Sequence, residues 1–110
     1  MTSVHLRDGA RAFAEKVFDD IREFSQDPVR GISRQGYGPL ENQVHEYLKK
    51  IAQDLNLEIK VDRCGNLFLT LSGTDRTLPC YMTGSHGDSV PQGGHYDGLA
   101  GVVAALTILW

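Results

Sequence analysis

The residues most able to do chemistry lie in one glycine-rich stretch that runs from Gly84 to Gly98. His86 and Asp88 stand two positions apart near its start, and Asp97 follows His86 by eleven positions. In an extended backbone, side chains two positions apart point the same way, so His86 and Asp88 can face one pocket. A metal-binding imidazole is commonly held by a carboxylate on its other ring nitrogen, which fixes the tautomer and raises the basicity of the ring. The stretch is therefore typical of a loop that presents metal ligands.

Taken one at a time, these residues also have simpler interpretations. A histidine at the end of a strand is usually a polar residue with a satisfied hydrogen bond. An aspartate just before a helix is most often its N-cap, and Asp97 precedes an apolar run that begins at Leu99. Spacing alone leaves the structural and the metal-binding interpretations of the loop open.

The loop lies between an expected strand and an expected helix, and open strand ends in α/β sheets are where ligands usually bind. Pro79 to Ser85 predicts the strand, and the small and apolar residues from Leu99 onward predict a helix of the interior. Gly93, Gly94 and Gly98 would let the connection fold back without steric cost.

Two amphipathic helices and a hairpin are predicted upstream of the loop. Apolar residues recur at steps of three and four over about 8–25, and again from Pro39, which suits a first helical turn, to about Asn56. Leu57 to Val61 and Leu67 to Leu71 predict an antiparallel hairpin around a turn at 62–66. The expected order is α-α-β-β-β-loop-α, and the expected class is α/β, a mixed sheet with helices packed on it.

Length and composition limit the possible partners. A chain of 110 residues with 41% hydrophobic and 23% charged residues is typical of one soluble globular domain at most. A net charge of -3 without a run of Lys or Arg argues against nucleic acid as a partner. The longest apolar run, Leu99 to Trp110, is shorter than the ~20 residues of a membrane span. The first residues lack the features of a secretory signal, so we expect no membrane association and a cytoplasmic location.

The loop resembles the metal-dependent amidohydrolases of the M20 peptidase clan. Within that clan it is most similar to the group of N-carbamoyl-L-amino-acid hydrolases, allantoate amidohydrolases and beta-ureidopropionases, where the gap between His86 and Asp97 is similarly short. The matching residues are Thr83-Gly84-Ser85-His86, Asp88, Val90-Pro91, Gly93-Gly94, Tyr96-Asp97-Gly98 and Gly101-Val102. The likeness covers about 31–110, because the group is also similar at Asp62, Gly65-Asn66-Leu67-Phe68 and Gly73-Thr74-Asp75.

The resemblance implies a zinc-peptidase-like catalytic domain, of which residues 1–110 would be an incomplete N-terminal portion. It implies that His86 binds one metal ion, that Asp97 bridges two, and that Asp88 orients His86 from behind. The cofactor would be two divalent metal ions, zinc or manganese, and the substrate a small ureido or N-carbamoyl acid with a linear C–N bond. The group's glutamate pair and its further histidine ligands are not among these 110 residues. The chain alone is therefore expected to be inactive, and the complete enzyme is expected to be a homodimer.

Two alternatives stay open from the sequence. Gly87-Asp88-Ser89-Val90 also resembles the Gly-Asp-Ser-Leu block of a serine esterase family, with Ser89 as nucleophile. A nucleophilic serine needs a base within hydrogen-bond reach, and the late Asp-x-x-His segment that supplies it in that family is not found in this sequence. The other alternative is a non-catalytic α/β module with a vestigial ligand loop. His95 stands where the amidohydrolase group more usually has Arg, Lys or Asn, so residues that bind substrate are unknown.

Overall fold

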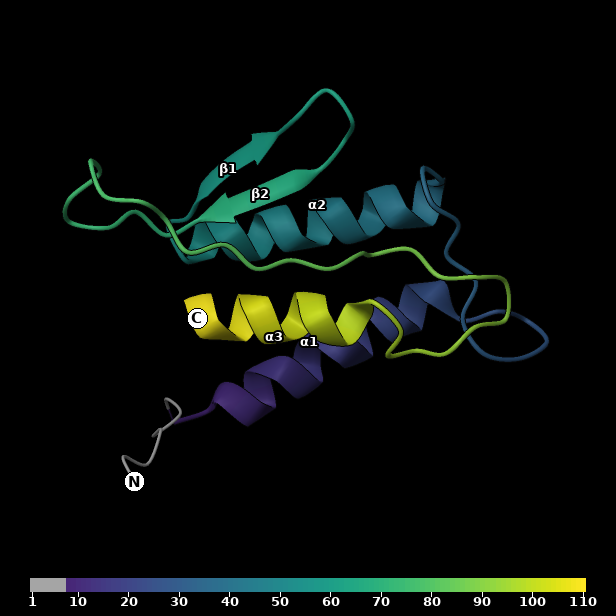
Figure 1. The fold of residues 1–110 in the computed structure, drawn as a ribbon. Coiled ribbons are helices and arrows are strands. Elements are labelled where there is room, and N and C mark those ends of the chain that lie inside the picture. Colours follow the sequence, from purple (N-terminus) through teal and green to yellow (C-terminus); the bar gives the residue numbers. More distant parts are fainter. Residues whose placement is uncertain (1–7) are drawn as a thin grey trace.

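The computed structural model describes residues 8–110, which fold into three helices and one two-stranded sheet (Figure 1). The elements in chain order are α1 (Ala10–Ser25), α2 (Pro39–Asp54), β1 (Glu58–Val61), β2 (Leu67–Thr70) and α3 (Leu99–Leu109). The predicted helices and the predicted hairpin are confirmed within a few residues of their expected ends. The class is α/β.

The three helices meet in one small apolar core. Amphipathic patterning turns one face of α1 and one face of α2 inward, whereas α3 is apolar almost all round. The buried residues of this core are Val17, Ile21, Val44, Leu48, Leu99, Val103 and Leu106. The ring of Phe13 on α1 stacks on Trp110, with ring centroids 5.0 Å apart, at the far end of α3 from the glycine-rich loop. The core therefore fixes the start of α3 relative to α1.

The hairpin is antiparallel and packs on α2 (Figure 1). Its register pairs Glu58 with Thr70 and Val61 with Leu67. The turn is closed by the Asp62 carboxylate, which accepts hydrogen bonds from the backbone N–H groups of Cys64 and Asn66, each at 2.9 Å. Side-chain acceptors of this kind substitute for backbone partners in tight turns.

The predicted third strand, Pro79 to Ser85, is wrong for this chain. In residues 8–110 the sheet consists of β1 and β2, and residues 79–85 run as an open trace between β2 and the glycine-rich loop (Figure 1). No backbone hydrogen bond joins them to another part of the described chain. A strand is stabilised by the N–H and C=O groups of a neighbour, and no such neighbour lies beside this segment. The side chain of Tyr81 is accordingly fully exposed.

Within residues 8–110, none of the helices combines the length and the apolar character that crossing a bilayer requires.

Candidate functional site

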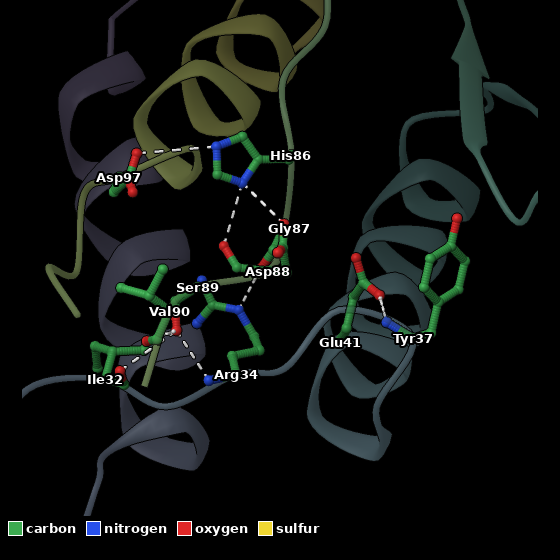
Figure 2. Close-up of polar contacts among 10 residues, drawn as sticks. All are labelled: Ile32, Arg34, Tyr37, Glu41, His86, Gly87, Asp88, Ser89, Val90 and Asp97. Atoms are coloured by element: carbon green, nitrogen blue, oxygen red, sulfur yellow. Dashed lines mark hydrogen bonds and ion pairs between the residues drawn. The ribbon is translucent and has the colours of Figure 1, made fainter. Parts of the chain in front are cut away.

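His86 lies between two carboxylates, as Figure 2 shows. Its Nδ1 is 2.9 Å from Oδ1 of Asp88 and 3.3 Å from the backbone oxygen of the same residue. Its Nε2 is 3.8 Å from Oδ1 of Asp97. The structure thus brings together all three residues that the sequence singled out. Their side chains are 54%, 41% and 67% exposed for His86, Asp88 and Asp97, so solutes can reach the site.

The contacts of His86 assign its tautomer. An ionised carboxylate only accepts hydrogen bonds, so a neutral imidazole facing Asp88 carries its proton on Nδ1. The lone pair is then on Nε2, which faces Asp97. The 3.8 Å between Nε2 and Asp97 is too long for a hydrogen bond. Metal–ligand bonds to nitrogen and oxygen are about 2.0–2.2 Å long, and the sum of two such bonds exceeds the distance between Nε2 and Oδ1 of Asp97. One cation could therefore contact both atoms.

Asp97 is not the N-cap of α3, which corrects the simpler interpretation of this residue. The N-cap position belongs to Gly98, and no side chain caps the helix. Asp97 contributes only its backbone oxygen, which accepts a hydrogen bond of 2.8 Å from the N–H of Leu99. Its carboxylate therefore stays available to a ligand.

His86 and Asp97 are the two groups at this site that could bind a metal ion directly, since Asp88 occupies the other ring nitrogen. Among residues 8–110, no group of three or more His, Cys, Asp or Glu side chains is placed to hold a metal ion. Catalytic zinc sites in proteins use three protein ligands and structural sites use four. The arrangement is thus one edge of a possible metal centre.

Two glycines let the loop lie against the first turn of α3. Gly98 has φ +69, and a Cβ added there would lie under 3.0 Å from three atoms of the His86 ring. One turn further, a Cβ on Gly101 would lie 2.6 Å from Cβ of Ser85. The imidazole therefore rests directly on the backbone of Gly98, at a φ value that side chains other than glycine rarely adopt.

Ser89, the nucleophile of the esterase alternative, is 6% exposed and holds two loops together. Its Oγ accepts a 2.9 Å hydrogen bond from the N–H of Arg34 and can donate to the carbonyl of Val90 at 3.0 Å or Ile32 at 3.3 Å (Figure 2). Its own N–H donates to the carbonyl of Arg34 at 2.7 Å. A nucleophilic serine needs access to substrate and a general base. The structure does not favour this alternative, because the hydroxyl is buried and bonded to backbone.

Arg34 is a residue that the sequence did not single out. Its side chain is fully buried and lies beneath the loop, where Nε donates to the carbonyl of Gly87 and Nη1 donates to Oγ of Ser25 at 2.9 Å (Figure 2). Burial lowers the pKa of the guanidinium, and attraction from Asp88 and Glu41 opposes that shift. A lone arginine in a polar, glycine-containing segment reads as a solvated side chain, so the sequence carries no signal for this role.

His95, undecided from the sequence, packs against aromatic side chains. Its ring centroid lies 5.7 Å from that of Phe18 on α1 and 5.1 Å from that of Tyr96. Burial lowers the pKa of the imidazole, which favours the neutral ring at this position. The ring thus helps attach the glycine-rich loop to α1.

Comparison with known proteins gives relatives of one kind. The chain is 37% identical over 92 residues to a ureidoglycolate hydrolase of rice (Oryza sativa subsp. japonica), a match that covers 84% of this chain and 19% of that protein. It is 39% identical over 98 residues to an N-carbamoyl-L-amino-acid amidohydrolase of Paenarthrobacter aurescens, covering 87% of this chain and 24% of the relative. No family model matches the chain.

The fold agrees with these relatives. A crystal structure of a hydantoinase/carbamoylase family amidase from Burkholderia ambifaria superposes with a TM-score of 0.84 and 29% identity, over 93% of this chain and 25% of that one. The chain therefore spans a quarter or less of the length of the relatives it matches. By sequence and by fold, the chain matches one part of amidohydrolases of a single group, the N-carbamoyl-L-amino-acid amidohydrolases, allantoate amidohydrolases and ureidoglycolate hydrolases.

Proposed function

We propose that this chain carries part of the metal centre of an amidohydrolase that cleaves a linear C–N bond of a ureido or N-carbamoyl acid. The observation that carries the proposal is the placement of His86, with one ring nitrogen on Asp88 and the other facing Asp97. A histidine held in this way is the usual form of an imidazole metal ligand. The names of the relatives, a ureidoglycolate hydrolase and an N-carbamoyl-L-amino-acid amidohydrolase among them, support the substrate class.

In the proposed centre, Nε2 of His86 would hold a metal ion, and the Asp97 carboxylate would be a ligand shared between that ion and a second one. Two divalent ions held there would supply Lewis-acid activation of water and of the scissile carbonyl. Asp88 accepts the Nδ1 proton, keeps the ring in one orientation and makes Nε2 a stronger donor. Imidazole and carboxylate ligands suit both zinc and manganese.

We propose further that residues 1–110 are an incomplete, N-terminal portion of the catalytic domain and are inactive alone. Two metal ligands are too few for a dinuclear site, and hydrolysis also needs a base close to the attacking water. The relatives are four to five times longer than the part they share with this chain. This supports the proposal that further sequence supplies the missing ligands and the base. A homodimeric complete enzyme, a cytoplasmic location, and the absence of nucleic-acid and membrane partners stay predictions.

The test begins with the reading frame downstream of codon 110. If it continues, the longer product should release ammonia from allantoate, ureidoglycolate or an N-carbamoyl-L-amino acid. A chelator should abolish the release, and zinc or manganese should restore it. Activity that is indifferent to chelation would contradict the metal mechanism.

Variants of the longer product test each ligand by elemental analysis as well as by rate. His86→Ala and Asp97→Ala should lose most of the metal, while Asp88→Asn should keep part of it and lose about 10–100-fold in affinity or rate. His45→Ala, which removes an imidazole on α2, is the matched control and should keep full metal content. Full metal content in Asp97→Ala would contradict the bridging role.

The 110-residue chain gives an independent check. Purified alone, it should neither release ammonia from these compounds nor retain two metal ions through gel filtration. Robust, chelator-sensitive turnover by the chain alone would contradict the proposal of an incomplete site, and would require ligands from a second copy.

A further inference from the structure

We propose that Arg34 is a positioning residue, whose buried guanidinium holds the peptide between His86 and Asp88 so that Asp88 stays on Nδ1 of the imidazole. The inference rests on the proposed function, because it gives Arg34 a purpose at the imidazole that would bind metal. In this proposal, Arg34 contacts neither the metal nor the substrate and acts through Asp88.

The side chain of Arg34 links the end of α1 to the loop. At one end, Nη1 donates to Oγ of Ser25 at 2.9 Å, and that hydroxyl in turn donates to the carbonyl of Ile21 at 2.7 Å. At the other end, Nε donates to the carbonyl of Gly87, the residue that lies between His86 and Asp88. The orientation of this peptide sets the direction of the backbone as it enters Asp88. The guanidinium therefore fixes that direction relative to α1.

The backbone of Arg34 holds the other side of Asp88. Its N–H donates to Oγ of Ser89 at 2.9 Å, and its carbonyl accepts from the N–H of Ser89 at 2.7 Å. One residue thus contacts both neighbours of Asp88, and the carboxylate between them has little freedom to leave the imidazole. In Figure 2, Arg34 lies beneath this turn, on the opposite side of Asp88 from His86.

The charge of Arg34 is costly where it lies, which argues for a purpose beyond filling space. The side chain is fully buried, and its Nη2 has no hydrogen-bond partner within residues 8–110. Apolar side chains of similar volume often replace buried charged groups without loss of stability. The guanidinium supplies directed hydrogen-bond donors to Ser25 and Gly87, and its charge attracts the Asp88 carboxylate. An apolar side chain could supply neither.

The test reads the tautomer of His86 directly. In the ¹⁵N-labelled 110-residue chain at a pH where the ring is neutral, the nitrogen shifts of His86 should report a proton mainly on Nδ1. Arg34→Lys keeps the charge but loses the planar pair of donors, so the ratio of the Nδ1–H to the Nε2–H form should fall about tenfold, as expected for the loss of one charge-assisted hydrogen bond. Arg30→Lys is the matched control, because that side chain is exposed and its Nε donates to Oε1 of Gln92 at 3.1 Å, away from Asp88; the tautomer ratio of His86 should not change in this variant.

A second variant keeps the proposal falsifiable if Arg34→Lys does not fold. Ser25→Ala removes one acceptor of the guanidinium and should lower the tautomer ratio about two- to threefold, as expected for a partial loss of the same network. An unchanged His86 tautomer in a folded Arg34→Lys or Ser25→Ala chain would overturn the proposal. Because this readout needs no metal, it separates the two ideas: a longer product that binds no metal would refute the proposed function while leaving the tautomer shift in place.

Discussion

Two adjacent segments of this chain, residues 79–85 and 86–93, differ sharply in how they are held. The first is predicted from its sequence to be a strand, yet makes no backbone hydrogen bond to the rest of the described chain. The second is polar and glycine-rich, yet Ser89 and Gly93 bond the backbone of Arg34 and Ile32, and His86 rests on Gly98. Local propensity alone would predict that residues 79–85 are held by backbone hydrogen bonds and that residues 86–93 are not.

The difference shows that the conformation of a segment is fixed by the groups that bond and contact it, and not by its amino-acid composition. Residues 86–93 lie between the connection that follows α1 and the first turn of α3, and both of these present backbone groups or close surfaces to them. Residues 79–85 have no backbone hydrogen-bonding partner in the described structure, although Ser85 at their end lies against Gly101 of α3. The residues that can do chemistry begin at His86, where the fixed part of the backbone begins.

The largest expected effect comes from closing the space under His86. Gly98→Ala adds a Cβ under 3.0 Å from the ring at a φ of +69, so it combines backbone strain with a clash. We expect a loss of about 2–4 kcal/mol in the free energy of unfolding, measured by urea denaturation. Gly84→Ala, in the free segment with nothing within 4 Å of the new Cβ, is the control and should change stability by less than about 0.5 kcal/mol. Equal effects of the two substitutions would remove the distinction between the segments.

Hydrogen exchange should display the same contrast without any substitution. The N–H groups of Ile32, Ser89 and Gly93 donate to backbone carbonyls at 2.7–3.0 Å, so they should exchange on the order of 100-fold more slowly than unprotected amides. Amides in 79–85 should exchange at rates close to those of an unfolded peptide. The measurement is hydrogen exchange followed residue by residue by NMR. Overlapping exchange rates for these three amides and the amides of 79–85 would contradict the contrast.

Ser89→Ala tests the link between the two loops at a smaller scale. The substitution removes the acceptor for the N–H of Arg34, and we expect a loss of about 1–2 kcal/mol in unfolding free energy. Ser72→Ala, which removes an exposed hydroxyl bonded to Glu58, is the matched control and should cost less. In a longer active product, Ser89→Ala should lower activity no more than it lowers the folded fraction. Complete loss of activity in a fully folded protein would restore the esterase alternative.

The smallest expected effect concerns an exposed ion pair that ties the connection after β2 back to β1. Hydrogen bonds from Arg76 and then Ser72 lower the pKa of Glu58 from 4.5 to about 2. Because the folded pKa lies below the unfolded one, the contribution of Glu58 to stability is present above pH 4.5 and is lost as the pH falls through about 2. Arg76→Ala should move the titration midpoint of the Glu58 carboxyl, followed by ¹³C NMR, back toward 4.5. Solvent screening keeps the change in stability small. Arg63→Ala is the control, and an unmoved midpoint in Arg76→Ala would contradict the assignment.

Periodicity alone located the helices and the hairpin, because their hydrogen bonds are local and their apolar faces repeat within a few residues. The types and spacing of His86, Asp88 and Asp97 likewise marked the loop as a possible ligand site. The third strand was wrong because a strand depends on a neighbour that its own residues cannot encode. The N-cap interpretation of Asp97, which the sequence left open, does not hold, because Gly98, at positive φ, takes the N-cap position.

The sequence by itself therefore determined which segments become helices and hairpin, and which side chains could act as ligands. Only the tertiary structure decided that Asp88 takes Nδ1 of His86 while Nε2 faces Asp97, since residues eleven positions apart meet only when the loop folds back on α3. It also decided that Arg34 is buried beneath that loop and that Ser89 is a structural hydroxyl. The physical reason is that burial and directed hydrogen bonds depend on which distant backbone groups come within about 3 Å, and a linear pattern does not contain that information.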